Sequence, residues 1–175
     1  MGADAVRIFH NQIFFKEPGG GPTPWHQDHY YWPIDTEKMC TIWMPLVDIT
    51  PEMGALTFAT RSHRLPFLDN MGISEGGQAH FDRIIADEGL PLVNHVMQAG
   101  DATIHAGWML HTALGNGGSY TREVSAISYF DDGARVFPED KMNPARISDL
   151  AVCVPGAKPG DIAASVMNPL VFKRD

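Results

Sequence analysis

Apolar residues along this chain gather in short runs that are rich in β-branched and aromatic side chains. Glycine, proline, asparagine or aspartate stands between one run and the next, and these residues mark turns. Several short strands separated by turn signals are typical of a sandwich or a barrel. The runs that we expect to form strands are 6–16, 39–49, 55–60, 92–97, 102–105 and 122–130.

Helical periodicity is confined to two short segments. Phe81, Ile84 and Ile85 recur at helical intervals within residues 80–88, and a second short helix is expected near 144–150. No internal repeat, low-complexity tract or shift in composition divides the chain. The pattern therefore predicts a mainly all-β fold in a single domain, residues 1–175, with few short helices.

Alternation in the second run assigns its side chains to two faces. Ile42, Met44 and Leu46 make one apolar face, whereas Thr41 and Trp43 lie on the opposite face. The two faces of this strand therefore differ in chemical character.

The last run places a cation among small side chains. Arg122 shares a face with Val124, Ala126 and Ser128, because residues two apart on a strand point the same way. These small neighbours leave room for another group beside the guanidinium.

The charge balance bears on the partners of the protein. The 13 basic residues are outnumbered by 21 acidic residues, which gives a formal net charge of −8, and no basic block offsets this excess. Binding to nucleic acid or to an anionic membrane surface is therefore disfavoured. We expect a small-molecule substrate, and any anionic ligand would need local Arg or Lys.

Cysteine usage and the chain ends suggest a location. Cys40 and Cys153 have neither disulfide-framework nor zinc-knuckle spacing, which favours reduced thiols in the cytoplasm. The first residues lack a basic region followed by an apolar run, and no stretch approaches the roughly 20 apolar residues of a membrane span. We expect a cytoplasmic protein, for which a homodimer is one open oligomeric state.

Two histidines and an aspartate provide the candidate chemistry. His26 and Asp28 are two positions apart, and on a strand such residues point to the same face, where one ion can bind both. A distant second histidine completes the set of two His and one carboxylate that holds non-heme Fe(II) and leaves other positions open. Both His105 and His111 are candidates for this third ligand, because a Gly-Trp turn lies between them.

The His-x-Asp spacing alone is weak support, because 8 His and 21 acidic residues in 175 produce it by accident. His80 and Asp82 have the same spacing, but they lie in the helical segment, where residues two apart do not face each other. We therefore expect His80 and Asp82 to form a solvated helix face.

A series of motifs covers nearly the whole chain: Lys-Glu-Pro-Gly-Gly (16–20), Trp-His-Gln-Asp (25–28), Ile-Trp-Met-Pro-Leu (42–46), Gly-Ala-Leu (54–56), Ser-His (62–63), Gly-Asp (100–101), His111 and Arg122. In this order the motifs resemble the phytanoyl-CoA dioxygenase branch of the Fe(II)/2-oxoglutarate oxygenases. Each motif is weak alone, whereas the joint match is strong. The resemblance implies a double-stranded β-helix, or jelly roll, of the cupin-like kind.

The resemblance also implies the site and the reaction. It makes His26, Asp28 and His111 the catalytic metal ligands, and it makes Arg122 the residue that binds the far carboxylate of 2-oxoglutarate. The separation 122 − 111 = 11 fits the family's usual interval. The implied cofactors are Fe(II), 2-oxoglutarate and O2, and the implied reaction hydroxylates a small organic substrate with release of succinate and CO2. Because halogenating relatives have a small residue at the position of Asp28, hydroxylation is favoured over halogenation.

Further residues of the co-substrate pocket follow from the resemblance. The positions of Trp43 and Gln12 line this pocket in relatives, although core packing also accounts for Trp43. Ala113 stands where some relatives carry a hydroxyl that bonds 2-oxoglutarate. Either Thr41 or Thr112 would have to replace that hydroxyl, unless the bond is absent.

Some alternatives remain open from the sequence. Residues 29–32 either line the substrate mouth or pack as an aromatic cluster under a loop. Family members usually carry a longer, partly helical segment before the first strand, so this chain is a short natural form, a fragment, or a protein whose flank a partner subunit covers. The alternatives to a dioxygenase are a catalytically silent jelly-roll binding protein and a cupin-like metal enzyme that does not use 2-oxoglutarate.

Overall fold

The computed structural model describes residues 1–65 and 71–174 of the chain. The helices are α1 (Glu75–Asp87) and α2 (Pro144–Cys153), and single 3-10 turns occur at Asp28–Tyr30, Pro51–Met53, Ser62–Arg64 and Glu139–Lys141. The strands are β1 (Ala5–Lys16), β2 (Thr23–His26), β3 (Ile34–Asp35), β4 (Met39–Pro45), β5 (Leu56–Ala59), β6 (Leu92–Asn94), β7 (Thr103–Ala106), β8 (His111–Ala113), β9 (Arg122–Asp131), β10 (Arg135–Val136) and β11 (Leu170–Lys173).

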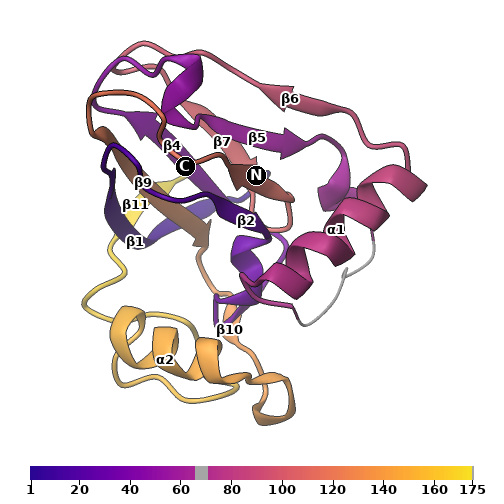
Figure 1. The fold of residues 1–175 in the computed structure, drawn as a ribbon. Coiled ribbons are helices and arrows are strands. Elements are labelled where there is room, and N and C mark those ends of the chain that lie inside the picture. The colour runs from indigo at the N-terminus through magenta and orange to yellow at the C-terminus, as the bar shows by residue number, and fades with distance from the viewer. Residues whose placement is uncertain (66–70, 175) are drawn as a thin grey trace.

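Two antiparallel sheets make up most of the fold. α1 lies beside β2, and α2 lies at the opposite end of the molecule from β5 and β6 (Figure 1). The larger sheet has the strand order β11-β1-β9-β4-β7, and the smaller sheet has the order β2-β8-β5-β6. The chain therefore crosses repeatedly from one sheet to the other, as in a double-stranded β-helix. The predicted mainly β jelly roll is confirmed.

β9 is the central strand of the larger sheet. It pairs with β1, where Lys16 lies opposite Arg122, and with β4, where Trp43 lies opposite Ala126. Side chains along β9 alternate strictly between buried and half-buried positions. The predicted face that begins at Arg122 and includes Ser128 is the buried one, so the cation points into the interior between the sheets.

Burial on β4 does not follow hydrophobicity. Thr41 is 4% exposed and Trp43 is 5% exposed, so their face is the one that points between the sheets. Ile42 and Met44 on the more apolar face are only half-buried, and Leu46 lies beyond the end of the strand with 43% of its surface exposed. The interior includes a polar site, and this site determines which face of β4 is buried.

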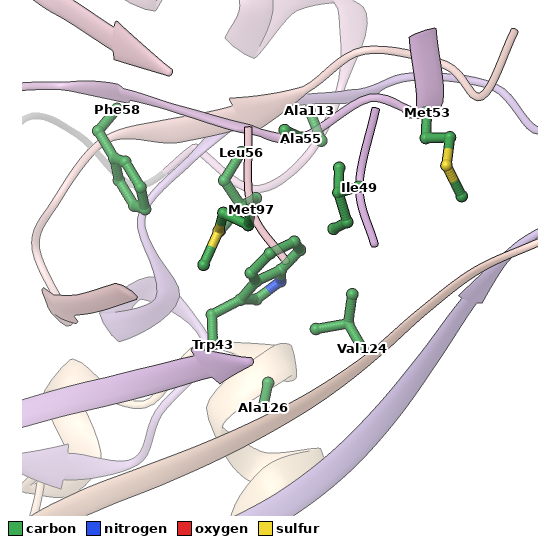
Figure 2. Packing of buried hydrophobic residues seen from close by; sticks show 10 residues of the cluster. All are labelled: Trp43, Ile49, Met53, Ala55, Leu56, Phe58, Met97, Ala113, Val124 and Ala126. Carbon is green, nitrogen blue, oxygen red and sulfur yellow. The ribbon is translucent and has the colours of Figure 1, made fainter. Parts of the chain in front are cut away.

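One hydrophobic cluster joins the two sheets. Figure 2 shows Trp43 pointing from β4 across the interior toward Leu56 and Met97, with Val124 and Ala126 of β9 also beside it. Removing this apolar surface from water stabilises the packing of one sheet on the other. The same side chains form an apolar boundary beside the polar groups that share the interior.

Both helices are capped at the N-terminus by side chains. Ser74 Oγ accepts a hydrogen bond from Gly77 N at 3.0 Å, and Asn143 Oδ1 accepts one from Arg146 N at 2.8 Å. α2 forms where a helix was predicted, but α1 begins earlier than predicted, because two glycines of low helix propensity in its first turn concealed its start. Among the described residues, neither helix is long and apolar enough to cross a membrane.

The strands that the sequence pattern did not reveal are short. β2 and β8 matter most for the functional site. β2 carries His26 and β8 carries His111, and the two histidines lie opposite each other where the strands pair. Three or four residues offer too few alternating positions for periodicity to identify a strand, and β2 and β8 also lack the apolar, β-branched composition that marked β5, β6 and β7.

Candidate metal and co-substrate site

His26 and Asp28 meet at the end of β2, where the chain bends. β2 ends at His26, Gln27 is extended with φ −119° and ψ 126°, and Asp28 begins a 3-10 turn. The prediction that His26 and Asp28 share the face of one strand is therefore wrong, although the side chains still approach each other. Gln27 holds the bend, because its Nε2 donates a hydrogen bond to Trp108 O at 2.6 Å.

His26, Asp28 and His111 form one cluster that can hold a metal ion. His111 is the first residue of β8 and lies opposite His26 in the smaller sheet. One ligand atom from each of the three residues lies within 4.8 Å of the others. His26 Nε2 is 3.7 Å from Asp28 Oδ1, and His111 Nε2 is 3.5 Å from the same oxygen. The structure therefore brings together the three residues proposed as ligands.

Backbone carbonyls fix the two imidazole rings. His26 Nδ1 lies 2.9 Å from Pro24 O, and His111 Nδ1 lies 2.9 Å from Met109 O. Because a carbonyl only accepts, each Nδ1 carries the proton and each Nε2 presents its lone pair toward the cluster. Burial, followed by the nearby His26, lowers the pKa of His111 to about 3, so this ring is neutral at pH 7. The donor set fits a divalent transition metal such as iron.

Protein groups hold the second oxygen of Asp28. Its Oδ2 lies 3.2 Å from His105 Nε2 and accepts a hydrogen bond from Thr41 Oγ1 at 3.1 Å. Thr41 Oγ1 in turn lies 2.9 Å from Ser128 Oγ. Burial opposes ionisation of Asp28, but the surrounding histidines, His111 first, outweigh this effect and keep the pKa of the carboxyl well below its usual range. Oδ1 is therefore the oxygen left for a metal ion.

His105 and His111 occupy different places around Asp28. His111 faces Oδ1 within the three-residue cluster, whereas His105 contacts Oδ2. The His105 ring is 4% exposed and packs near Phe58, with 5.3 Å between ring centroids. This geometry favours His111 as the third ligand and gives His105 a supporting contact to Asp28.

A cavity of about 430 Å³ lies between the sheets and includes the cluster. The four residues proposed to bind the co-substrate, namely Gln12, Thr41, Trp43 and Arg122, all line this cavity. It therefore connects a metal-binding end to a cationic end within one space between the sheets.

Arg122 provides the cationic end of the cavity. Its side chain is buried, and its guanidinium carbon lies 5.6 Å from the centroid of the Trp43 ring. Nη1 donates a hydrogen bond to Gly54 O, and Nε is buried without a partner among the described residues. No acidic side chain within residues 1–65 and 71–174 forms an ion pair with Arg122. A buried guanidinium with an unsatisfied donor fits a carboxylate ligand.

The remaining pocket residues differ in role. Trp43 is both a cavity wall and a member of the core cluster, so both interpretations of this residue hold. Thr112 Oγ1 donates to Thr23 O at 2.6 Å, and Thr112 does not line the cavity. β8 therefore contributes His111 and Ala113, and no hydroxyl, to the cavity wall.

Residues 29–32 divide between the two roles proposed for them. His29 is 1% exposed and stacks on Trp108 with 4.2 Å between centroids, and its Nε2 lies 2.8 Å from Ile34 O. Burial lowers the pKa of His29 to about 4, as expected for a packed, neutral ring. Tyr31 lines the cavity, and Trp32 both lines the cavity and belongs to a buried hydrophobic cluster.

α1 supports the metal-binding strand in a way that sequence patterns missed. Trp25 Nε1 donates to Asp82 Oδ1 at 2.9 Å, and Trp25 N donates to Gln78 Oε1 at 2.9 Å. Asp82 lies on a helix with His80 and is exposed, as predicted, but its carboxylate also accepts a hydrogen bond from Trp25. Its carboxylate anchors the residue that directly precedes His26, and no local signal in the sequence links these distant positions.

Solved structures with similar folds cover nearly all of this chain. The epimerase SnoN, in a crystal structure in complex with Fe3+, alpha ketoglutarate and nogalamycin RO, matches 95% of this chain at 27% identity with a TM-score of 0.77, and the match covers 65% of SnoN. The carbocyclase SnoK from nogalamycin biosynthesis matches 96% of this chain at 24% identity with a TM-score of 0.75, and the match covers 63% of SnoK. At 24% identity, the similarity to SnoK shows a shared fold.

Sequence comparison identifies the family. A probable alpha-ketoglutarate-dependent hypophosphite dioxygenase from Stutzerimonas stutzeri is 27% identical over 128 residues. The match covers 71% of this chain and 45% of that protein, so this chain spans less than half the length of the relative. The sequence profile of Phytanoyl-CoA dioxygenase (PhyH) matches residues 2–124, a segment that includes His26, Asp28, His111 and Arg122. The chain belongs to the phytanoyl-CoA dioxygenase family.

Proposed function

We propose that this protein is an Fe(II)- and 2-oxoglutarate-dependent dioxygenase that hydroxylates a small organic substrate and releases succinate and CO2. One observation carries the proposal: the cluster of His26, Asp28 and His111 shares a single cavity with the guanidinium of Arg122, whose Nε has no partner among the described residues. 2-Oxoglutarate has a chelating keto acid at one end and a carboxylate at the other, so its two ends match these two features. The contents of the SnoN complex and the name of the Stutzerimonas relative support the same activity.

Each residue of the site has a role in this proposal. His26, Asp28 and His111 would hold Fe(II), and Asp28 would offer Oδ1 to the ion. Arg122 binds the far carboxylate of 2-oxoglutarate, and Trp43 lies beside that carboxylate. When bound, Fe(II), 2-oxoglutarate and O2 supply the oxidising chemistry. The chain itself orients the ligands and excludes water from them, which strengthens the charged contacts inside the cavity.

Asp28 also determines the proposed type of reaction. Its carboxylate would take the place that a halide needs beside Fe(II), and His105 and Thr41 contact the carboxylate at Oδ2. We therefore infer hydroxylation in preference to halogenation.

The proposal is tested by measuring binding and turnover separately. The protein, loaded anaerobically with Fe(II), is expected to bind 2-oxoglutarate and to develop the visible charge-transfer absorption of the chelate. On admission of O2, slow succinate formation should follow even without substrate. Asp28→Ala should abolish both signals, whereas His95→Ala, which alters an exposed histidine outside the cavity, should leave both intact. A wild-type protein that binds Fe(II) but not 2-oxoglutarate would contradict the proposal.

The same experiment separates the alternative functions. A catalytically silent binding protein would bind Fe(II) and 2-oxoglutarate but form no succinate with any substrate. A cupin-like enzyme that does not use 2-oxoglutarate would have no need of Arg122, so Arg122→Ala would leave its activity and ligand binding unchanged. A metabolite screen for stimulated succinate formation then identifies the substrate.

Two further predictions accompany this function. The substrate is a small molecule. This prediction is supported by the relatives, since the Stutzerimonas protein is named for hypophosphite and the SnoN structure contains nogalamycin RO. Cytoplasmic location and a homodimer stay predictions from the sequence, and fractionation and size-exclusion chromatography with light scattering check them. Treatment of residues 1–175 as one oxygenase domain is a proposal of the same kind, checked by limited proteolysis.

A further inference from the structure

The cavity also has polar walls that the proposed site does not use. Lys16 on β1 lies opposite Arg122 at the cationic end. His10, six residues earlier on the same strand, lies opposite Ser128 and is about 20 Å along the strand from Lys16. Ser128 Oγ lies 2.9 Å from Thr41 Oγ1, which supports the metal end. His10, which also lines the cavity, is therefore far from the cationic end and level with the metal end.

Three further residues line this part of the cavity with His10. The rings of His10 and Trp32 have 6.4 Å between their centroids, and Tyr31 packs against the hydrophobic cluster that contains Trp32 and Leu150. Burial is the first cause of a raised pKa at Tyr31, and the nearby charge of Asp149 contributes to it. We call these residues the acidic wall of the cavity: His10, Tyr31, Trp32 and Asp149.

α2 holds Asp149 at a fixed place relative to the metal end. Asn143 Nδ2 donates a hydrogen bond to Tyr30 O at 3.1 Å, and Arg146 Nη2 donates one to His29 O at 3.2 Å. Both carbonyls belong to the turn that carries the metal-binding carboxylate. Asp149 is therefore positioned by the same segment that positions the metal cluster.

Asp149 has no counter-ion. Its side chain is half-buried and forms neither a hydrogen bond nor an ion pair within residues 1–65 and 71–174. Burial lowers the pKa of His10, so that ring is neutral at pH 7, and it raises the pKa of Asp149. Arg146 on the same helix does not line this cavity, and its guanidinium lies 4.0 Å from the centroid of the Phe137 ring. A partly buried carboxylate without a counter-ion is costly, and a bound cation relieves that cost.

We propose that the acidic wall binds the primary substrate, and that this substrate is a compact protonated amine whose ammonium group pairs with Asp149. This inference rests on the proposed function and names its substrate class. An alcohol would give the carboxylate a hydrogen bond, whereas an ammonium group also compensates its charge. The rings of Tyr31 and Trp32 provide an apolar surface for the body of the substrate and favour a nearby cation. An anionic substrate is disfavoured by repulsion from Asp149.

The location of Asp149 in the chain suits a role in substrate selection. The family profile matches residues 2–124, which include the metal cluster and Arg122. α2 lies beyond this segment, at Pro144–Cys153. The residues proposed for the shared chemistry are therefore inside the profile, and the residue proposed to select the substrate is outside it.

The test compares three probes that share one ring and differ in charge: cyclohexylmethylamine, cyclohexylmethanol and cyclohexanecarboxylate. Calorimetric titration measures the binding of each probe to the protein loaded anaerobically with Fe(II) and 2-oxoglutarate. The amine should bind about 10-fold more tightly than the alcohol, because a hydrogen bond between two charged groups is stronger than one to a neutral hydroxyl. The carboxylate should bind more weakly than the alcohol.

A substitution at Asp149 assigns this preference to one side chain. Asp149→Asn keeps the shape of the side chain and removes its charge, so the affinity for the amine should fall by about 10-fold. The affinity for the alcohol should change by less than about twofold. Asp140→Asn, at an exposed aspartate outside the cavity, is the matched control and should bind all three probes as the wild type does.

Each opposite result overturns the inference. The wild-type protein would bind the amine no better than the alcohol or would not bind it at all, or Asp149→Asn would keep the full preference for the amine. The comparison of probes on the wild type decides the matter if Asp149→Asn does not fold. A wild-type protein that cannot be loaded with 2-oxoglutarate refutes the proposed function instead, so the two failures are distinguishable.

Discussion

The two ends of the cavity differ in whether protein groups compensate the charges that are buried there. At the metal end, backbone carbonyls bind both Nδ1 atoms, and His105 and Thr41 contact Asp28 Oδ2. At the cationic end, Lys16 lies opposite Arg122, Arg122 Nε is buried without a partner, and neither cation has an acidic partner among the described residues. The metal end is thus preorganised by protein contacts, whereas the cationic end needs a ligand to complete it.

The difference has a physical consequence for binding. Preorganised ligands lose little entropy when they bind an ion, so the metal end should depend on each of its supporting contacts. The cationic end stores an unfavourable electrostatic state that an anion relieves, so affinity there should depend on charge. The following substitutions separate these two kinds of dependence.

Removing the carboxylate at the metal end should have the largest effect. Asp28→Ala deletes the carboxylate that the Nε2 atoms of His26 and His111 face. Fe(II) affinity should therefore fall by more than about 100-fold, because losing a metal ligand costs more than losing a residue that only supports a ligand. Anaerobic Fe(II) titration measures the change. Asp140→Ala, at an exposed aspartate outside the cavity, is the matched control and should bind Fe(II) normally. Equal Fe(II) affinity in both variants would refute the assignment of the metal end.

Removing the guanidinium should affect only the other end. Arg122→Met should weaken 2-oxoglutarate binding by roughly 100-fold, because a buried charge contact is lost. Fe(II) affinity should stay within about twofold, since Arg122 contacts no residue of the cluster. Calorimetric titration of each ligand checks both values, and Arg83→Met on the exposed surface of α1 is the control. Parallel losses of Fe(II) and 2-oxoglutarate would show that the two ends are not separable.

The support behind Asp28 should have an intermediate effect. Thr41→Val preserves the shape of the side chain but removes the hydrogen bond to Oδ2, so Fe(II) affinity should fall by about 10-fold. Thr41→Ser retains the hydroxyl and should restore most of the affinity. Thr57→Val, on β5 outside the cavity, is the control. If Thr41→Ser binds Fe(II) as weakly as Thr41→Val, the loss comes from packing and the hydrogen bond is not the cause.

The sequence predicted those parts of the fold that repeat over many residues. Alternation over 122–130 identified β9 and the face shared by Arg122 and Ser128, because ten residues of strand give a clear period of two. The three-residue β8, which carries His111, has no such period. Choosing His111 over His105 therefore needed the family resemblance, since spacing alone allowed both.

Contacts between distant segments could not be predicted in this way. Asp28 meets His105 across 77 positions, and Lys16 reaches Leu114 across 98 positions. The burial of Thr41 on β4 was also hidden, because hydrophobicity favours the opposite face of the strand. Local sequence patterns predict helices and strands, whereas tertiary packing determines which polar groups face each other.

The link between α1 and β2 should have the smallest effect of the four. Asp82→Ala removes the acceptor of Trp25 Nε1, and a lost hydrogen bond of this kind lowers the free energy of unfolding by about 1 kcal/mol. For a chain of this length, that corresponds to a fall in Tm of about 2–4 °C. Fe(II) affinity should fall by less than about threefold, since the bond positions Trp25 and not His26 itself.

The matched control for this link lies five residues further along the same helix. Asp87→Ala removes an acid from the last turn of α1, where a negative charge is unfavourable beside the helix C-terminus, so Tm should stay constant or rise slightly. Thermal unfolding followed by circular dichroism compares the two variants without metal. Equal Tm values would show that the Trp25 to Asp82 bond does not stabilise the fold, and the metal end would then depend on the sheet contacts of β2 with β8 alone.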